Sequence, residues 1–65
     1  MEIKLNGKCV ESSSHTLMDL VLEKGFDPEA VVAEVNFRVI CQNSWKDLDL
    51  NPGDSIEILN FVGGG

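Results

Sequence analysis

The first residues of the chain alternate between apolar and charged side chains. In the opening stretch MEIKL, Ile3 and Leu5 share one side and the charged residues share the other, which is typical of a half-buried β-strand. The dipeptide Asn6-Gly7 comes next, and it favours a tight hairpin because both turn positions need positive φ. Residues 8–12 return as the partner strand, so the chain is predicted to begin with a β-hairpin.

Residues 16–23 instead follow the period of an α-helix. Thr16 can cap this helix, Gly25 can supply the left-handed residue that ends it, and Phe26 can then pack back onto the helix end. An apolar stripe runs along the helix, so one face is predicted to be buried. The stripe consists of Leu17, Leu20 and Val21, widened by Met18 and Leu22.

β-branched and other apolar residues dominate the remaining predicted strands. These strands are expected at residues 30–35, 38–40 and 55–61, joined by a turn at Asn36-Phe37, a loop with one helical turn at 44–47, and a tight turn at 52–54. Phe37 is unusual in a hairpin turn, because a bulky residue at positive φ is strained. We expect either a different type of turn there or an exposed contact residue.

The order of these elements is β-β-α-β-β-β, which predicts an α+β domain with the helix across one face of a mixed sheet. The last strand has the apolar content of a central strand, and we place it beside the first. This arrangement is the β-grasp or ubiquitin-like fold, with four to five strands and one main helix. We assign residues 1–61 to this domain and residues 62–65 to a flexible C-terminal tail.

The two sides of the last strand are expected to make different contacts. Ile56 and Ile58 belong under the helix, whereas Leu59 and Phe61 point to the helix-free face. We interpret Leu59 and Phe61, together with Val62, as an apolar surface that binds a partner protein. The alternative is that the strand end curls into the core or shifts its register through a bulge.

Size and charge narrow the range of functions. A chain of 65 residues, 43% hydrophobic, forms one small domain with little room for a substrate pocket, which favours a binding or carrier module. Its net charge of −6 disfavours nucleic acid and favours basic protein surfaces as partners. We see neither a membrane-spanning apolar run nor a signal peptide, so we expect a cytoplasmic protein.

The tail offers a reactive group of its own. Residues 62–65 can extend about 13 Å, and the glycines Gly63, Gly64 and Gly65 make the tail thin enough to thread a narrow channel. The terminal carboxylate of Gly65 would then reach the active site of a partner. A carboxylate becomes an acyl donor once that partner adenylates it with ATP, and a sulfur or nitrogen nucleophile can then attack it.

The C-terminal stretch PGDSIEILNFVGGG carries a family resemblance. The chain resembles the ThiS family of small sulfur carriers in this stretch, the Asn6-Gly7 hairpin, the helix that begins TL, the segment VAEVN at 32–36, and Trp45. The resemblance implies that a ThiF-type enzyme adenylates Gly65, with Gly63 and Gly64 as the threading segment. The resulting thiocarboxylate then gives its sulfur to thiazole synthase in thiamin biosynthesis, with a donor such as a cysteine desulfurase supplying the sulfur.

The same resemblance implies a protein co-substrate and not an enzyme. No cofactor is expected to be bound, because the ATP is used by the activating partner. The chain departs from the family pattern at Phe37, where glycine often follows the asparagine of the turn. This departure bears on the local turn and not on the carrier function.

Several other residues could suggest different chemistry. His15 has no nucleophile or carboxylate partner at a suitable spacing, and no Cys/His cluster or phosphate-binding Gly-rich loop indicates a metal or ATP site. Cys9 and Cys41 are expected near opposite edges of the sheet, as isolated thiols that pack like small apolar groups. Trp45 is interpreted as a lid over the lower core, with a partner contact as the alternative.

Three other functions remain open. A MoaD-type small subunit of molybdopterin synthase would use the same tail chemistry in a stable complex, although the tail NFVGGG lacks the prolines expected before the glycines. A ubiquitin-like modifier would form isopeptides with lysines of other proteins. A plain β-grasp interaction module would make no use of the tail.

Overall fold

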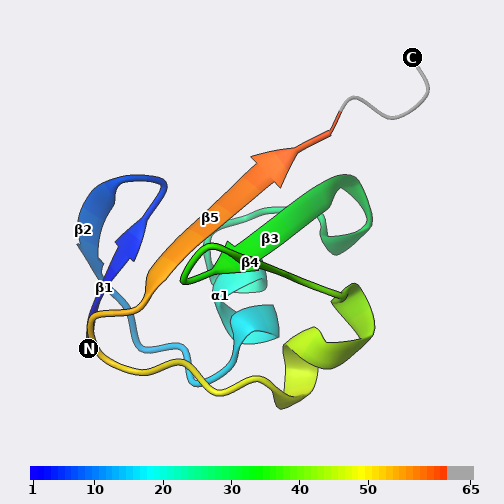
Figure 1. The fold of residues 1–65 in the computed structure, drawn as a ribbon. Coiled ribbons are helices and arrows are strands. Elements are labelled where there is room, and N and C mark those ends of the chain that lie inside the picture. Colours follow the sequence, from blue (N-terminus) through cyan, green and yellow to red (C-terminus); the bar gives the residue numbers. More distant parts are fainter. Residues whose placement is uncertain (62–65) are drawn as a thin grey trace.

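The computed structural model describes residues 1–61, which form a five-stranded mixed sheet with one α-helix packed on it (Figure 1). The elements are β1 (Glu2–Leu5), β2 (Lys8–Glu11), α1 (Leu17–Glu23), the 3-10 helix η1 (Pro28–Ala30), β3 (Val31–Val35), β4 (Arg38–Ile40), the 3-10 helix η2 (Gln42–Asp47) and β5 (Ser55–Asn60). The strand order is β2-β1-β5-β3-β4, and β5 runs parallel to β1 and antiparallel to β3. The predicted α+β, β-grasp architecture is therefore confirmed, with β5 at the centre of the sheet.

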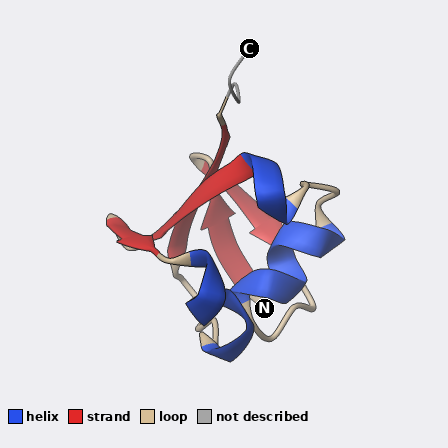
Figure 2. Ribbon diagram, turned by 90° about the vertical axis from the view of Figure 1, so that its right-hand side faces the viewer, coloured by secondary structure: helices blue, strands red, loops and turns tan. Residues whose placement is uncertain are grey.

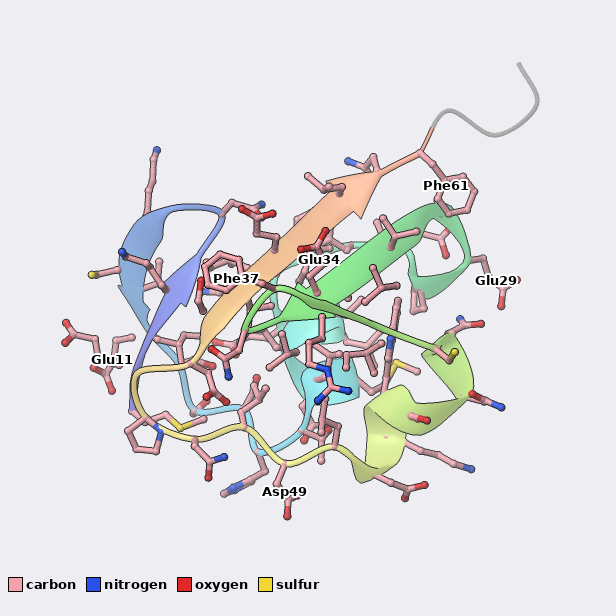
Figure 3. The ribbon with its side chains drawn as sticks, in the orientation of Figure 1. Glu11, Glu29, Glu34, Phe37, Asp49 and Phe61 are labelled. Carbon is pink, nitrogen blue, oxygen red and sulfur yellow. The ribbon has the colours of Figure 1, made fainter. Side chains whose placement is uncertain are left out.

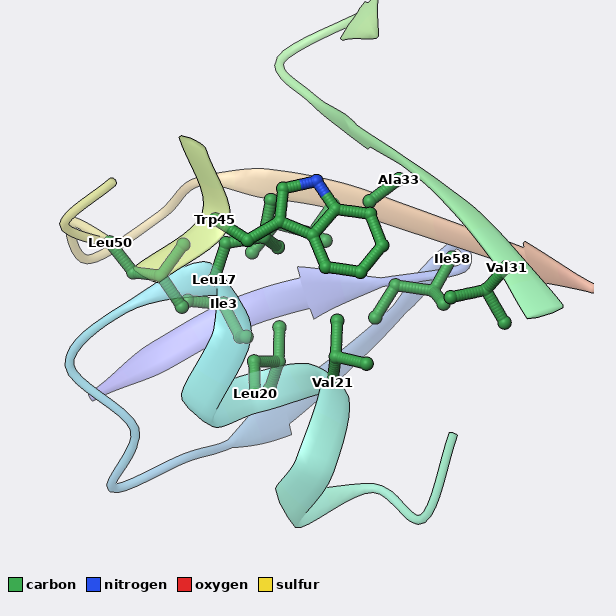
Figure 4. Packing of buried hydrophobic residues seen from close by; sticks show 10 residues of the cluster. Ile3, Leu17, Leu20, Val21, Val31, Ala33, Trp45, Leu50 and Ile58 are labelled. Carbon is green, nitrogen blue, oxygen red and sulfur yellow. The ribbon is translucent and has the colours of Figure 1, made fainter. Parts of the chain in front are cut away.

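The hydrophobic core lies between α1 and one face of the sheet (Figure 2). Leu17, Leu20 and Val21 are fully buried, as the apolar stripe predicts, and they share one cluster with Ile56 and Ile58 of β5 (Figure 4). The alternation along β5 therefore places its isoleucines under the helix. Within residues 1–61, no helix covers the other face of the sheet (Figure 2).

Trp45 closes the lower end of this core from η2. Its side chain is buried, and the indole Nε1 donates a hydrogen bond to the carbonyl oxygen of Ile40 at 2.9 Å. The buried polar atom is thus paired, as an indole N–H in a core requires. The predicted lid is confirmed, and the alternative of a partner contact is wrong because the ring is not accessible.

Both ends of α1 have the predicted caps. Thr16 accepts a hydrogen bond through Oγ1 from the backbone N–H of Asp19 at 3.1 Å. At the other end Gly25 has a φ of 81°, and Phe26 donates its backbone N–H to the carbonyl oxygen of Val21 at 3.0 Å. The helix is seven residues long, and no helix within residues 1–61 has the length and apolar character to cross a membrane.

Two asparagines in the hairpin turns hold β5 in place. Asn6 and Asn36 both have a φ of 51°, which presents their side chains to the central strand. Asn6 accepts a hydrogen bond from the Ile58 N–H at 2.8 Å and donates one to the Ile58 carbonyl oxygen at 3.2 Å. Asn36 accepts from the Ser55 N–H at 3.0 Å. The two asparagine side chains therefore form hydrogen bonds with the β5 backbone, as the backbone of a neighbouring strand would.

The turn at Asn36-Phe37 differs from one of our two expectations. Both residues have positive φ, 51° and 71°, so the hairpin keeps the type I′ geometry and no other turn type replaces it. The Phe37 side chain is 83% exposed, which is the second of the expected outcomes. An aromatic residue therefore occupies a left-handed position while contributing little to the core.

Three side chains expected to pack are exposed instead. Leu22 lies on the solvent side of α1, so the apolar stripe is narrower than predicted. Cys9 and Cys41 are exposed free thiols, and the prediction that they pack as small apolar groups is wrong. Cys9 stands on the helix-free face of the edge strand β2, opposite Lys4, and Cys41 precedes η2 at the end of the other edge strand. Their placement toward opposite edges of the sheet is confirmed.

Candidate functional site

The C-terminal end of β5 leads directly into the four tail residues. The strand ends at Asn60, and the Phe61 backbone N–H donates a hydrogen bond to the carbonyl oxygen of Ala30 at 3.0 Å. β3 lies alongside, with Val32 directly opposite Leu59. The backbone is therefore held in place as far as Phe61, so the tail begins at a fixed point on the domain.

Apolar side chains surround this point on the helix-free face. Leu59 and Phe61 are each 48% exposed, and Val32 is 42% exposed. Directly opposite residues on neighbouring strands have Cβ atoms about 4.5–5.5 Å apart, so Val32 and Leu59 form one continuous surface. The Phe61 ring leans from the end of β5 toward the β3 side of the sheet (Figure 3). We call Val32, Leu59 and Phe61 the exit patch.

The exposure of Leu59 and Phe61 agrees with the predicted helix-free placement. The alternative, a strand end that curls into the core, is wrong because the pairing of β5 with β3 runs without interruption through Leu59 and Asn60. The partner-binding role of these residues stays a prediction. Four residues with predicted roles lie outside the described residues: Val62, the threading residues Gly63 and Gly64, and the reacting residue Gly65. The predicted flexibility of the tail also concerns these residues and stays a prediction.

The sequence predictions missed two residues that shape this end of the domain. Val32 alternates with the buried Val31 and Ala33, and this alternation is the signal that would have placed it on the exposed face. Asn6 has a second role, because its side chain bonds the β5 backbone at Ile58. The hairpin dipeptide signals the turn but carries no sign of that contact.

A shallow hollow of about 660 Å³ occupies the opposite end of the same face, next to Phe37. Its lining includes Glu2, Lys4, Cys9 and Ser55, so it lies beside the start of β5. Within residues 1–61, no group of three or more His, Cys, Asp or Glu side chains could hold a metal ion. We centre the candidate site on the exit patch because it adjoins the tail, whereas the hollow lies at the other end of β5.

The domain also contains a polar cluster with a structural role. The buried Ser12 and Ser14 both donate hydrogen bonds to Oε1 of Glu23, that from Ser12 at 2.8 Å. These bonds, first the one from Ser14 and then the one from Ser12, hold the pKa of Glu23 below its ordinary value, and the charge of Lys24 lowers that pKa further. The cluster ties the end of α1 to the segment after β2, on the side of the molecule away from the helix-free face.

Comparison with known proteins gives consistent matches along the whole chain. The model of the ThiS family matches residues 2–65. The sulfur carrier protein ThiS of Bacillus subtilis is 34% identical over 65 residues, which cover 97% of this chain and 98% of that protein. Two proteins named thiazole synthase, from Magnetococcus marinus and Paramagnetospirillum magneticum, are each 35% identical over 66 residues. This chain spans only 20% of the length of each of those two proteins.

Solved structures agree with the sequence matches. The crystal structure of a thiamine biosynthesis protein (ThiS) from Geobacter metallireducens superposes with a TM-score of 0.84 at 28% identity, and the match covers 100% of both chains. A solution NMR structure of a thiamine biosynthesis protein from the same organism gives a TM-score of 0.81 at 28% identity, covering 100% of this chain and 88% of that one. The similarity therefore includes both the sheet and the strand that carries the exit patch.

Proposed function

The chain belongs to the ThiS family, and on this premise we propose that it is a sulfur carrier protein of thiamin biosynthesis. In this role it is a co-substrate of other enzymes, with no catalysis and no bound cofactor of its own. The family match favours this function over a molybdopterin synthase subunit or a ubiquitin-like modifier. We also propose a cytoplasmic location, since the free thiols of Cys9 and Cys41 suit a reducing compartment.

The exit patch is the observation that carries the proposal. The central strand β5 carries the half-exposed Leu59 near its end, and the half-exposed Phe61 follows the strand, immediately before the sequence VGGG. An exposed apolar patch at such a point supports a contact with a partner protein. The residues after Phe61 can reach about 13 Å beyond it when extended. Three glycines in this reach present no side chain that would obstruct a narrow channel.

The proposed chemistry takes place at the Gly65 carboxylate. In an adenylating enzyme of the ThiF type, a carboxylate oxygen attacks the α-phosphorus of ATP and pyrophosphate leaves, which gives an acyl-adenylate. A sulfide nucleophile then attacks the acyl carbon and displaces AMP, which carries the carboxylate oxygen away. The product is a C-terminal thiocarboxylate. A cysteine desulfurase delivers sulfur as a persulfide, so a thiol reductant must supply two electrons to bring that sulfur to the sulfide level used in this step.

Thiazole synthase is the proposed acceptor of this sulfur. Two relatives named thiazole synthase contain, within a fivefold longer polypeptide, a stretch that is 35% identical to this chain. This linkage supports a working relationship between the two kinds of protein. The same tail must then enter two active sites in turn, that of the adenylating enzyme and that of thiazole synthase.

Two variants of the C-terminus test the proposal. Deleting Gly65 shortens the reach by about 3.3 Å, and misplacing a reacting group by even about 1 Å can cost around a hundredfold in rate. Appending one alanine after Gly65 keeps a carboxylate but moves it past the reacting position. We expect the parent, given ATP, adenylating enzyme and sulfide, to gain the mass difference between sulfur and oxygen. Neither variant should gain it.

Circular dichroism is the folding control, because neither change touches the packed domain. Thiolation of the alanine-extended chain at the rate of the parent would contradict the proposal, since the tail would then not be recognised at its end. Covalent conjugates with lysines of other proteins would instead indicate a modifier. If the mass of the parent does not change, neither tail chemistry is supported, and a plain β-grasp interaction module is the function that remains.

A further inference from the structure

The central strand β5 is supported unequally on its two sides. On the β3 side the pairing runs to Asn60, and the Phe61 N–H still bonds the carbonyl oxygen of Ala30 at 3.0 Å. On the β1 side the strand pairing ends where Leu5 lies opposite Ile56. Within residues 1–61, the part of β5 beyond Ile56 therefore has a strand neighbour on the β3 side only (Figure 1).

Asn6 extends the support on the β1 side by two residues. It follows directly after β1, and its backbone N–H donates a hydrogen bond to the carbonyl oxygen of Ile56 at 2.9 Å. Its side chain then bonds both the N–H and the carbonyl oxygen of Ile58, at 2.8 Å and 3.2 Å. In the part of the chain that the structure describes, Ile58 is the last residue of β5 that is bonded from this side.

The contact at Ile58 fixes the orientation of the strand end. Two-stranded ribbons twist more than wider sheets, and beyond Ile58 the described chain pairs β5 with β3 alone. The Asn6 side chain shortens this free ribbon and keeps its root in line with β1. The tail starts at the end of the ribbon, and its four residues can extend about 13 Å. A rotation of about 5° at the start of such an arm moves its far end by about 1 Å.

We propose that Asn6 is a positioning residue for the reaction of Gly65, because it holds the end of β5 in the orientation that brings the tail into the adenylating enzyme correctly. The inference rests on the proposed function. A reacting group that is misplaced by about 1 Å can lose around a hundredfold in rate. A side chain that acts only through β5 can therefore control the rate at the distant carboxylate.

Asn36 provides a matched residue at the other end of β5. It has the same φ of 51° in the second hairpin, and its side chain accepts a hydrogen bond from the Ser55 N–H at 3.0 Å. Both asparagines thus bond the backbone of β5 from a left-handed turn position. They differ in the place of contact, since Ser55 is the first residue of the strand and Ile58 lies near its end.

Replacing each asparagine by glycine tests the inference, because glycine keeps the turn and removes the side-chain bonds. Asn6→Gly and Asn36→Gly should lower the urea midpoint by similar amounts. With ATP, adenylating enzyme, sulfide and a saturating concentration of the carrier, Asn6→Gly should form thiocarboxylate at least about tenfold more slowly than the parent. Since saturation removes differences in docking, kcat should change more than KM. Asn36→Gly should keep a kcat within about twofold of the parent.

Amide hydrogen exchange tests the same contact without any partner enzyme. The Phe61 N–H, bonded to Ala30, should exchange about tenfold faster in Asn6→Gly than in the parent, because the end of β5 opens more often. In Asn36→Gly the same amide should exchange within about twofold of the parental rate, since that variant loosens the opposite end of the strand.

Each contrary result overturns a definite part of the inference. A parental kcat in Asn6→Gly would show that the reaction does not depend on this side chain. Equal losses of kcat in both glycine variants would show a general effect of lower stability. Unchanged exchange at Phe61 would show that the contact does not hold the end of β5. A parent chain that gains no thiocarboxylate would refute the proposed function itself, whereas the exchange rates would still decide whether Asn6 holds the strand end.

Discussion

The two faces of the sheet differ in what covers them, and adjacent residues of β5 show the difference most clearly. Ile58 is buried under α1, whereas Leu59 is half exposed on the other side of the same strand. Folding accounts for the first face, since its apolar residues fill the core beneath the helix. Folding does not account for the helix-free face, where the exposed side chains of Val32, Val39 and Leu59 contribute little to the stability of the folded state. The apolar surface of the helix-free face therefore points to function.

The largest expected effect comes from truncating these two neighbours separately. Ile58→Ala should lower the free energy of unfolding by about 2–5 kcal/mol, because it removes buried methyl groups and leaves a cavity. Leu59→Ala should lower it by only about 0.5 kcal/mol, as is usual for exposed positions. Urea denaturation of both variants measures the difference. Equal losses would contradict the comparison, since Leu59 would then belong to the core.

Much of the fold follows from sequence pattern because the pattern is set by burial. The alternation in β5, the apolar stripe of α1 and the Thr16 and Gly25 caps each have a direct physical cause in the chain nearby. Exposed apolar positions are harder to predict from sequence, because an apolar residue on the surface cannot be told from one in the core by its type alone. Val39 and Leu22 are examples of this difficulty.

Long-range contacts of polar side chains could not be predicted in the same way. The bond of Asn6 to Ile58 joins residues 52 positions apart, and it depends on the sheet already being assembled. The opposed position of Glu34 and Glu57 likewise requires the register between β3 and β5. The proposed reacting residue, Gly65, follows from the family resemblance, whereas the contacts around the exit patch require the three-dimensional structure.

A smaller effect is expected at the tip of the β3–β4 hairpin. Phe37→Gly should raise the free energy of unfolding by up to about 1 kcal/mol. Glycine adopts positive φ without strain, which stabilises the folded state, and its greater freedom in the unfolded chain offsets part of this gain. The matched variant Asn36→Gly should instead be destabilised, since it loses the hydrogen bond from the Ser55 N–H. Chemical denaturation of the two variants provides the measurement. If Phe37→Gly is destabilised as well, the ring packs usefully over the hollow and the helix-free face contributes to stability there.

The smallest effect concerns the acid side of the stability curve. Ser14 and Ser12 stabilise the charged form of Glu23, so its pKa is lower in the folded than in the unfolded chain. This contribution is therefore fully present above the unfolded pKa of a glutamate, about 4.3, and is lost as the pH falls through the lower folded value.

We expect Glu23→Gln to be less stable than the parent at pH 7, and the gap between the two to close as the pH falls below the unfolded pKa and through the lower folded pKa of Glu23. Glutamine keeps an acceptor oxygen for the serine hydroxyls but lacks the charge, so the closing gap isolates the charge contribution. Urea midpoints measured from neutral to acidic pH test this, with Glu29→Gln, an exposed carboxylate outside the cluster, as the control. A gap that stays constant with pH would mean that the serines bind the neutral and charged forms equally well. Glu23 would then hold α1 in place by geometry alone.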